Sequence, residues 1–184
     1  LDDYNFMWNA KMENKLPSVA CSEGHYKMWR RIIDEDLKNV LIVEDDSDIE
    51  YDRYYEFLKL EKPNGLIYLG GRFDFPKIKD WNRIDIEKYM ENKSQEGFNK
   101  VSDDFIITGT HGYFIKDKSI VEKMFETCKG KTNKYKSTLT DVCISKTKID
   151  KYYYYPSISN VESLPSLIGH HVPESTCKNY ITKN

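Results

Sequence analysis

The alternation of helical and strand signals along the chain is the strongest constraint on its fold. Apolar side chains recur at helical spacing over residues 22–37, and a short aliphatic run at residues 40–43 follows at once. A β-branched run of this length, bounded by polar residues, predicts a short, fully buried strand. Because helical and strand segments continue to alternate up to residue 155, we predict an α/β domain whose mixed sheet is flanked by helices.

The same patterns predict the individual elements. Ser22 stands where it would cap the first helix. Residues 74–104 indicate a long polar loop with a short helix, and the tail from residue 158 shows no period. We expect helices over residues 22–37, 48–60, 118–128 and 138–146, and strands over residues 40–43, 66–69, 105–108, 112–115 and 152–155.

Composition excludes several classes of protein. With 39% hydrophobic and 14% aromatic residues, the chain is too apolar for a disordered protein. Its longest aliphatic stretch, residues 40–43, is far shorter than the ~20 residues that a membrane span needs. The net charge of −2 gives no sign of a nucleic-acid partner. We therefore expect the 184 residues to form one folded domain with no transmembrane segment.

The cysteines constrain the compartment. Cys21, Cys128, Cys143 and Cys177 form no C-x-x-C pair and have no zinc-finger spacing. We expect four reduced thiols in a reducing compartment, which favours the cytoplasm. The alternative is one or two disulfides in the lumen of the secretory pathway.

Three successive acids, Glu44, Asp45 and Asp46, directly follow the aliphatic run, and we call them the acidic block. In open α/β sheets, ligands bind at the carboxyl ends of strands. Clustered carboxylates repel one another, and a hard cation such as Mg²⁺ or Mn²⁺ relieves that repulsion. The pattern therefore predicts a metal site, although the acids could also be solvated, or one could cap the next helix near Ser47.

Two known architectures place acids in this way. The first is the response-regulator receiver, a signalling switch whose opening strand is similar to residues 41–46. A receiver also needs a phosphoacceptor aspartate at the end of a later strand. Here the strand at residues 66–69 comes too early and ends in Gly70-Gly71, and a helical segment precedes the acidic strand. The receiver is therefore only a remote alternative.

The second architecture accounts for more of the chain. Residues 20–29, with His25 and Trp29 four positions apart, and residues 40–46 together resemble glycosyltransferase family 25, which contains lipooligosaccharide and collagen galactosyltransferases. Its signature is a helix carrying such a histidine and tryptophan, then a strand ending in Glu-Asp-Asp. Three further blocks are similar to later family motifs: Thr108 to Ile115 to a Gly-Thr-x-x-Tyr block, Leu139-Thr140-Asp141-Val142 to an aspartate block, and Tyr155-Pro156 to the strand and proline that follow. The resemblance covers about residues 20–157 and leaves residues 158–184 as a tail.

This resemblance implies a GT-A-like, Rossmann-like fold, a nucleotide-sugar donor and Mn²⁺. It predicts a metal-dependent, inverting enzyme that moves a hexose, galactose or glucose, from a UDP-sugar to a hydroxyl of a glycan or glycoprotein. A metal bound to the diphosphate would stabilise the leaving group as a Lewis acid. Glu44 and Asp46, two positions apart, suit a DxD-like clamp for Mn²⁺ or Mg²⁺, with His170 as a late imidazole ligand.

The remaining site residues follow from the same blocks. We expect Asp45 to contact the ribose or sugar of the donor, and His25, Thr110 and His111 to line the pocket for the donor and its diphosphate. Asp141 is the candidate base for the acceptor hydroxyl. Its alternative role is to stabilise the dipole of a helix that begins beside it. For His25 the alternative is a packed core histidine.

The chain also departs from the family pattern. Gly24 stands where the family usually has serine, directly before the histidine. The first strand of the nucleotide-binding half is not visible between residues 1 and 19. Either those residues precede Leu1 in a longer polypeptide, or this chain lacks part of the donor site. The second case predicts a catalytically weak glycosyltransferase-like module that binds glycans or a partner.

Overall fold

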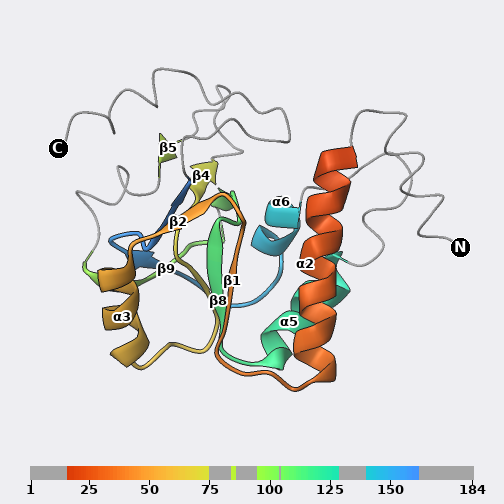
Figure 1. The fold of residues 1–184 in the computed structure, drawn as a ribbon, viewed down its shortest axis with the longest axis horizontal. Coiled ribbons are helices and arrows are strands. Elements are labelled where there is room, and N and C mark those ends of the chain that lie inside the picture. The colour runs from red at the N-terminus through yellow and green to blue at the C-terminus, as the bar shows by residue number, and fades with distance from the viewer. Residues whose placement is uncertain (1–15, 75–83, 86–94, 104, 129–139, 162–184) are drawn as a thin grey trace, which may run out of the picture.

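A mixed, five-stranded sheet forms the centre of the structure (Figure 1). The computed structural model describes residues 16–74, 84–85, 95–103, 105–128 and 140–161. The parallel pair in this sheet is β3 with β9, and its other neighbours are antiparallel. The strand order is β1 (Val40–Val43), β8 (Gly112–Ile115), β3 (Leu66–Tyr68), β9 (Lys151–Tyr155) and β6 (Gly97–Lys100).

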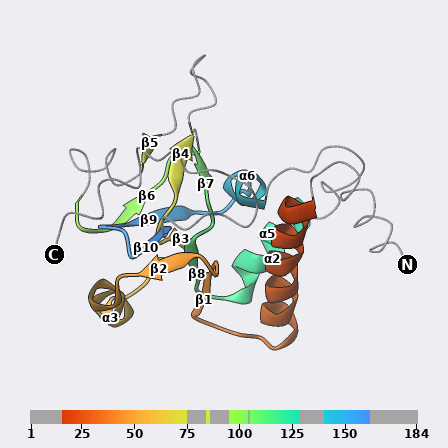
Figure 2. The same cartoon turned by 45° about the horizontal axis from the view of Figure 1, so that its top comes forward.

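Two smaller sheets extend this framework. Strand β2 (Ser47–Ile49) pairs with β10 (Ser159–Val161), so the chain just after the acidic block is joined to the last described strand. Strand β4 (Arg72–Asp74) lies between β5 (Ile84–Asp85) and β7 (Ile106–Thr108). Figure 2 shows β4, β5 and β7 above the central sheet.

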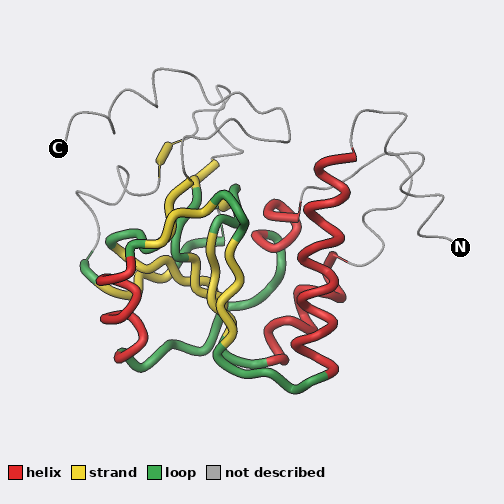
Figure 3. Tube along the Cα trace, viewed as in Figure 1, coloured by secondary structure: helices red, strands yellow, loops and turns green. Residues whose placement is uncertain are grey.

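Helices cover both faces of the central sheet (Figure 3). The helices α2 (Leu16–Asp34), α5 (Lys118–Cys128) and α6 (Thr140–Ser145) lie on one side, and α3 (Tyr51–Lys59) lies on the other. The fold is therefore mixed α/β with a sheet flanked by helices, as the alternating pattern predicts.

Each face of the sheet has its own hydrophobic core. On the side of three helices, Trp29 and Ile32 of α2 pack with Tyr113 of the sheet. On the other side, Phe57 of α3 packs against Phe114 and Tyr154. Successive residues of a strand point to opposite faces, so Tyr153 belongs to the first core and Tyr154 to the second. Both tyrosines are buried.

Most predicted elements are confirmed. Helix α5 and strand β1 have the predicted bounds, and β3, β7, β8 and β9 differ from theirs by at most one residue at either end. The first helix differs, because it begins at Leu16 and passes through Ser22. Ser22 is not a cap: its side chain is buried, and its hydroxyl oxygen accepts a hydrogen bond from Thr140 Oγ1 at 2.6 Å.

Other expectations are wrong. Residues 47–49 form β2 instead of the first turn of a helix, and α3 begins only at Tyr51. Strands β4, β5 and β6 occupy parts of the predicted loop, and β10 lies in the predicted tail. Strand β1 is not fully buried, because it lies at the edge of its sheet and Val43 is 45% exposed.

A disulfide joins Cys128 at the end of α5 to Cys143 in α6. This pair contradicts the expectation of four reduced thiols and agrees with its alternative. Cys21 is a free thiol, and Cys177 lies outside the described residues. Among the described helices, none has the length and apolar character of a membrane span. The compartment stays a prediction.

Candidate functional site

Four segments that are distant in the sequence meet beside the middle of α2. They are Cys21 and His25 of α2, the acidic block after β1, the turn before β8, and the start of α6. The Cys21 thiol shows this convergence. Burial raises its pKa to about 11, and the charges of Glu44, Asp141, Asp46 and Asp45 add to the rise. The acidic block and Asp141 therefore lie near the same thiol.

Backbone hydrogen bonds tie the acidic block to the turn at residues 109–112, which we call the glycine turn. The carbonyl oxygen of His111 accepts a hydrogen bond from the Glu44 N–H at 3.1 Å and another from the Ser47 hydroxyl. This junction continues the β1–β8 ladder, in which Val43 pairs with Gly112. These bonds therefore fix the acidic block and the glycine turn relative to one another.

Gly109 and Asp141 shape the glycine turn. Gly109 has a φ of +80°, and a Cβ there would lie 2.6 Å from Nε2 of His111. The turn therefore favours glycine for its backbone conformation, and a larger residue would also displace the His111 ring. Oδ2 of Asp141 accepts a hydrogen bond from the Gly109 N–H at 3.0 Å, while Oδ1 accepts one from the Val142 N–H at 2.7 Å. Helix α6 thus supports the turn through Asp141.

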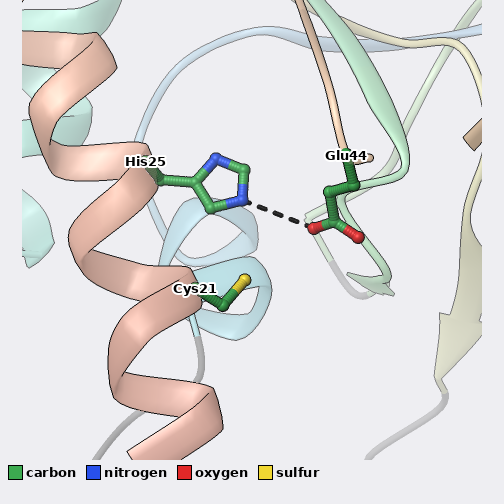
Figure 4. Close-up of side chains that lie close together, drawn as sticks. All are labelled: Cys21, His25 and Glu44. Atoms are coloured by element: carbon green, nitrogen blue, oxygen red, sulfur yellow. Dashed lines mark hydrogen bonds and ion pairs between the residues drawn. The ribbon is translucent and has the colours of Figure 1, made fainter. Parts of the chain in front are cut away.

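Glu44 lies at the centre of the side-chain contacts. Its Oε1 accepts a hydrogen bond from the Thr110 hydroxyl and lies 3.4 Å from Nε2 of His25 (Figure 4). Its Oε2 lies 3.6 Å from Nδ1 of His111. Burial alone would raise the pKa of this carboxyl, but the contacts with His111, His25 and Thr110 outweigh burial and lower the pKa well below its ordinary value. Glu44 is therefore a carboxylate at neutral pH.

A hydrogen-bond chain through the core orients His25. The hydroxyl of Tyr113 accepts a hydrogen bond from the Trp29 Nε1–H at 2.9 Å and lies 2.8 Å from Nδ1 of His25. Burial raises the pKa of Tyr113, so its phenol is neutral. Because its oxygen already accepts from Trp29, we assign its proton to the bond with Nδ1. The imidazole proton is then on Nε2, facing Glu44.

The other acids differ in their surroundings. Asp45 is exposed. Asp46 is partly buried, and its Oδ1 is a buried atom without a hydrogen-bond partner among the described residues. Nδ1 of His111 is likewise buried and makes no hydrogen bond within the described chain. Asp46 Oδ1 is therefore a polar atom without a partner among the described residues, whereas His111 Nδ1 faces Glu44 Oε2 as an ion-pair contact.

The structure thus brings together seven of the eight site residues that the sequence predicts: His25, Glu44, Asp45, Asp46, Thr110, His111 and Asp141. His170 lies outside the described residues. Sequence reasoning did not include Cys21 or Tyr113 in the site. The spacing of Cys21 and His25, four apart on one helix face, was the available signal for the first. Tyr113 belongs to a recognised motif block, but its contact with His25 required the fold.

Fold and site together define an α/β protein with an acid-rich polar site at the carboxyl end of a strand, where such folds bind ligands. The chain belongs to glycosyltransferase family 25 (LPS biosynthesis protein), whose family model matches residues 2–152. Comparisons with curated proteins and with solved structures found no significant match.

The family match confirms the resemblance seen in the sequence and identifies the chain as a glycosyltransferase, which implies a sugar donor and a glycan acceptor. The matched residues include the helix with His25, the acidic block, the glycine turn and Asp141. Membership in this family also argues against the response-regulator receiver as the explanation of the acidic block.

Proposed function

We propose that this glycosyltransferase moves a hexose, galactose or glucose, from a UDP-sugar to a hydroxyl of a glycan or glycoprotein, with inversion and with a divalent cation, in a GT-A-like domain. The observation that carries the proposal is the convergence of the acidic block, the glycine turn and Asp141 beside α2. Such a site offers carboxylates for a cation, polar groups for a diphosphate and a carboxylate for an acceptor hydroxyl.

The acidic block fits a hard cation. Oδ1 of Asp46 is buried without a partner among the described residues, and Glu44 is held as a carboxylate by its neighbours. Carboxylate oxygens are the ligands that Mg²⁺ and Mn²⁺ take. In this proposal Asp46 and Glu44 hold the cation, with His170 as a further ligand. When bound, the cation would stabilise negative charge on the departing diphosphate.

The chain's own polar groups would then bind and orient the donor. Thr110 and His25 fix the Glu44 carboxylate in one orientation through contacts to Oε1. His111 would contact the diphosphate through the imidazole that the glycine turn presents, and the exposed Asp45 would accept hydrogen bonds from the ribose or sugar hydroxyls. Rigid support of this kind lowers the cost of ordering the site when substrate binds.

Asp141 is the proposed base. In the transfer, the acceptor oxygen bonds to the anomeric carbon, UDP leaves with the bonding electrons, and the hydroxyl proton passes to Asp141. Both oxygens of Asp141 accept a backbone N–H, which fixes the carboxylate in place. A positioned base contributes roughly 10²–10⁴ in rate.

The first experiment measures UDP release from UDP-galactose and UDP-glucose with and without Mn²⁺. We expect Mn²⁺-dependent release that is lost in Asp46→Asn, with the circular dichroism spectrum unchanged. Asp48→Asn is the matched control, because Asp48 is an exposed acid two residues further on. Release that survives both EDTA and Asp46→Asn would overturn the metal proposal. No release with either donor, together with retained glycan binding, would favour the glycan-binding module instead.

A second variant tests the base. Asp141→Asn keeps an oxygen that can accept from Gly109 and removes the basic carboxylate. We expect turnover to fall by roughly 10²–10⁴ with the fold intact. Unchanged turnover in this variant would show that Asp141 only supports the glycine turn.

A further inference from the structure

A second group of metal-ligating side chains lies on the α2 side of Glu44. One ligand atom from each of Cys21, His25 and Glu44 lies within 4.8 Å of the others. Figure 4 shows the sulfur of Cys21 and the imidazole of His25 projecting from successive turns of α2 toward the Glu44 carboxylate. The spacing of the two helix residues, i and i+4, places both on one face. From this geometry we propose that Cys21, His25 and Glu44 bind a thiophilic divalent cation of the Zn²⁺ type.

The surroundings of His25 support this assignment independently. The side chain is 5% exposed, and Tyr113 contacts its Nδ1 while Trp29 holds Tyr113 in place. Metal-bound histidines characteristically donate their second ring N–H to a fixed oxygen, and Tyr113 offers such an oxygen to Nδ1 once Nδ1 carries the imidazole proton. The arrangement directs Nε2 of His25 at the centre of the group.

The two partners of His25 leave room for a cation. The Cys21 sulfur is outside any disulfide and makes no hydrogen bond within the described chain. The contact between His25 Nε2 and Glu44 Oε1, at 3.4 Å, is longer than a typical N–H···O bond. The three ligand atoms are therefore close together without short bonds among themselves, and a cation would replace the contacts that the Thr110 hydroxyl makes with His25 Nε2 and Glu44 Oε1.

The donor set selects the class of cation. Thiolate and imidazole are ligands of Zn²⁺, whereas Mg²⁺ and Mn²⁺ favour oxygen. Three protein ligands would leave a fourth tetrahedral position for water. On binding, the Cys21 thiol releases its proton to solvent. The His25 proton moves from Nε2 to Nδ1, and the bond with Tyr113 reverses, so that the Tyr113 oxygen accepts from Nδ1 as well as from Trp29.

This site is distinct from the one proposed for the hard cation, because Cys21 and His25 belong only to it and Asp46 does not take part. Glu44 is common to both sites. A soft cation here would therefore join α2 to the end of β1 and occupy a carboxylate that the hard cation would otherwise use. Binding of the soft cation does not depend on the proposed transferase activity.

The test is a titration with Co²⁺, which reports thiolate ligation through a sulfur-to-cobalt charge-transfer band. We expect the wild-type protein to show this band and Zn²⁺ to displace it. The band should be lost in Cys21→Ser and Cys21→Ala and weakened in His25→Gln. It should persist in Cys177→Ser and in Asp46→Asn, which separates this site from the second thiol and from the hard-cation site.

Thermal unfolding supplies a second readout that needs no spectroscopic band. Zn²⁺ should raise the unfolding midpoint of the wild type and leave that of Cys21→Ser unchanged, since a cation bound only by the folded state stabilises it. Absence of the band in the wild type would overturn the proposal. Survival of the band in a folded Cys21 variant, or its loss in Asp46→Asn, would overturn it equally.

Discussion

Glu44 connects more of the candidate site than any other side chain described above. Its two oxygens face different partners, with Thr110 and His25 at Oε1 and His111 at Oε2. Its backbone N–H is bonded to the His111 carbonyl, so both its main chain and its side chain are held by the glycine turn. Because these partners bind the ionised form of the Glu44 carboxyl, protonation of Glu44 should lower the stability of the fold.

We predict that Glu44→Gln weakens the dependence of stability on acid. Burial raises the pKa of Glu44, but His111, His25 and Thr110 outweigh burial, so the folded pKa lies below the ordinary value of 4.5. The ionised carboxylate therefore stabilises the fold above about pH 4.5, and this contribution is lost as the pH falls toward the folded pKa. Urea unfolding of both proteins between neutral and acidic pH should show the smaller loss of unfolding free energy in the variant.

The matched control is Glu122→Gln, which changes an exposed acid on α5. Its pH profile should follow that of the wild type. Parallel profiles for Glu44→Gln and the wild type would contradict the interpretation of Glu44 as a carboxylate held by its neighbours.

Helices α5 and α6 are joined covalently, and α6 in turn holds the glycine turn through Asp141. The disulfide spans a sequence separation of 15 residues. By the loop-entropy model, a cross-link of that size stabilises the fold by about 3 kcal/mol. We predict that Cys128→Ser with Cys143→Ser lowers the unfolding free energy by about that amount in urea denaturation.

The wild type should lose a similar amount when a reductant is added. The double variant should be insensitive to the reductant, which separates the disulfide from other effects of the reagent. Equal stability of oxidised and reduced wild type would contradict a stabilising role for the bridge.

Elements with a strong local pattern could be predicted, and those that depend on distant partners could not. Helix α5 carries a periodic apolar face with Ile120, Val121 and Met124, so its bounds follow from the sequence. Strand β2 is only three residues long and exists through pairing with β10, more than a hundred positions later. The stability of such a strand comes from its tertiary context. Ser22 was predicted as a cap because the sequence does not show that it bonds to Thr140, 118 positions later.

The candidate site shows the same division. His25, the acidic block, Thr110, His111 and Asp141 could be named because they stand in motif blocks. Their meeting follows from pairing of β1 with β8, which no local pattern specifies. The orientation of His25 depends on Tyr113 and Trp29, and a hydrogen-bond chain of this kind requires three-dimensional placement.

The two faces of the central sheet serve different purposes. The core shared by α2, α5 and α6 contains Trp29 and Tyr113, which support the site directly. The core under α3 is built around Phe57, and no hydrogen bond joins its side chains to the site within the described chain. Both cores stabilise the same sheet, so damage to either should lower global stability. Only damage to the first should alter the chemistry of the site.

We therefore predict different outcomes for Trp29→Phe and Phe57→Leu. Each side chain is fully buried, so each change should lower the unfolding free energy by roughly 1–3 kcal/mol in urea. Trp29→Phe also removes the donor to Tyr113, which changes the hydrogen bond between Tyr113 and Nδ1 and with it the proton distribution on His25. Imidazole nitrogen resonances measured by NMR should shift for His25 in Trp29→Phe and remain in place in Phe57→Leu. Equal shifts in the two variants would mean that the site depends on the whole sheet and not on the core beside it.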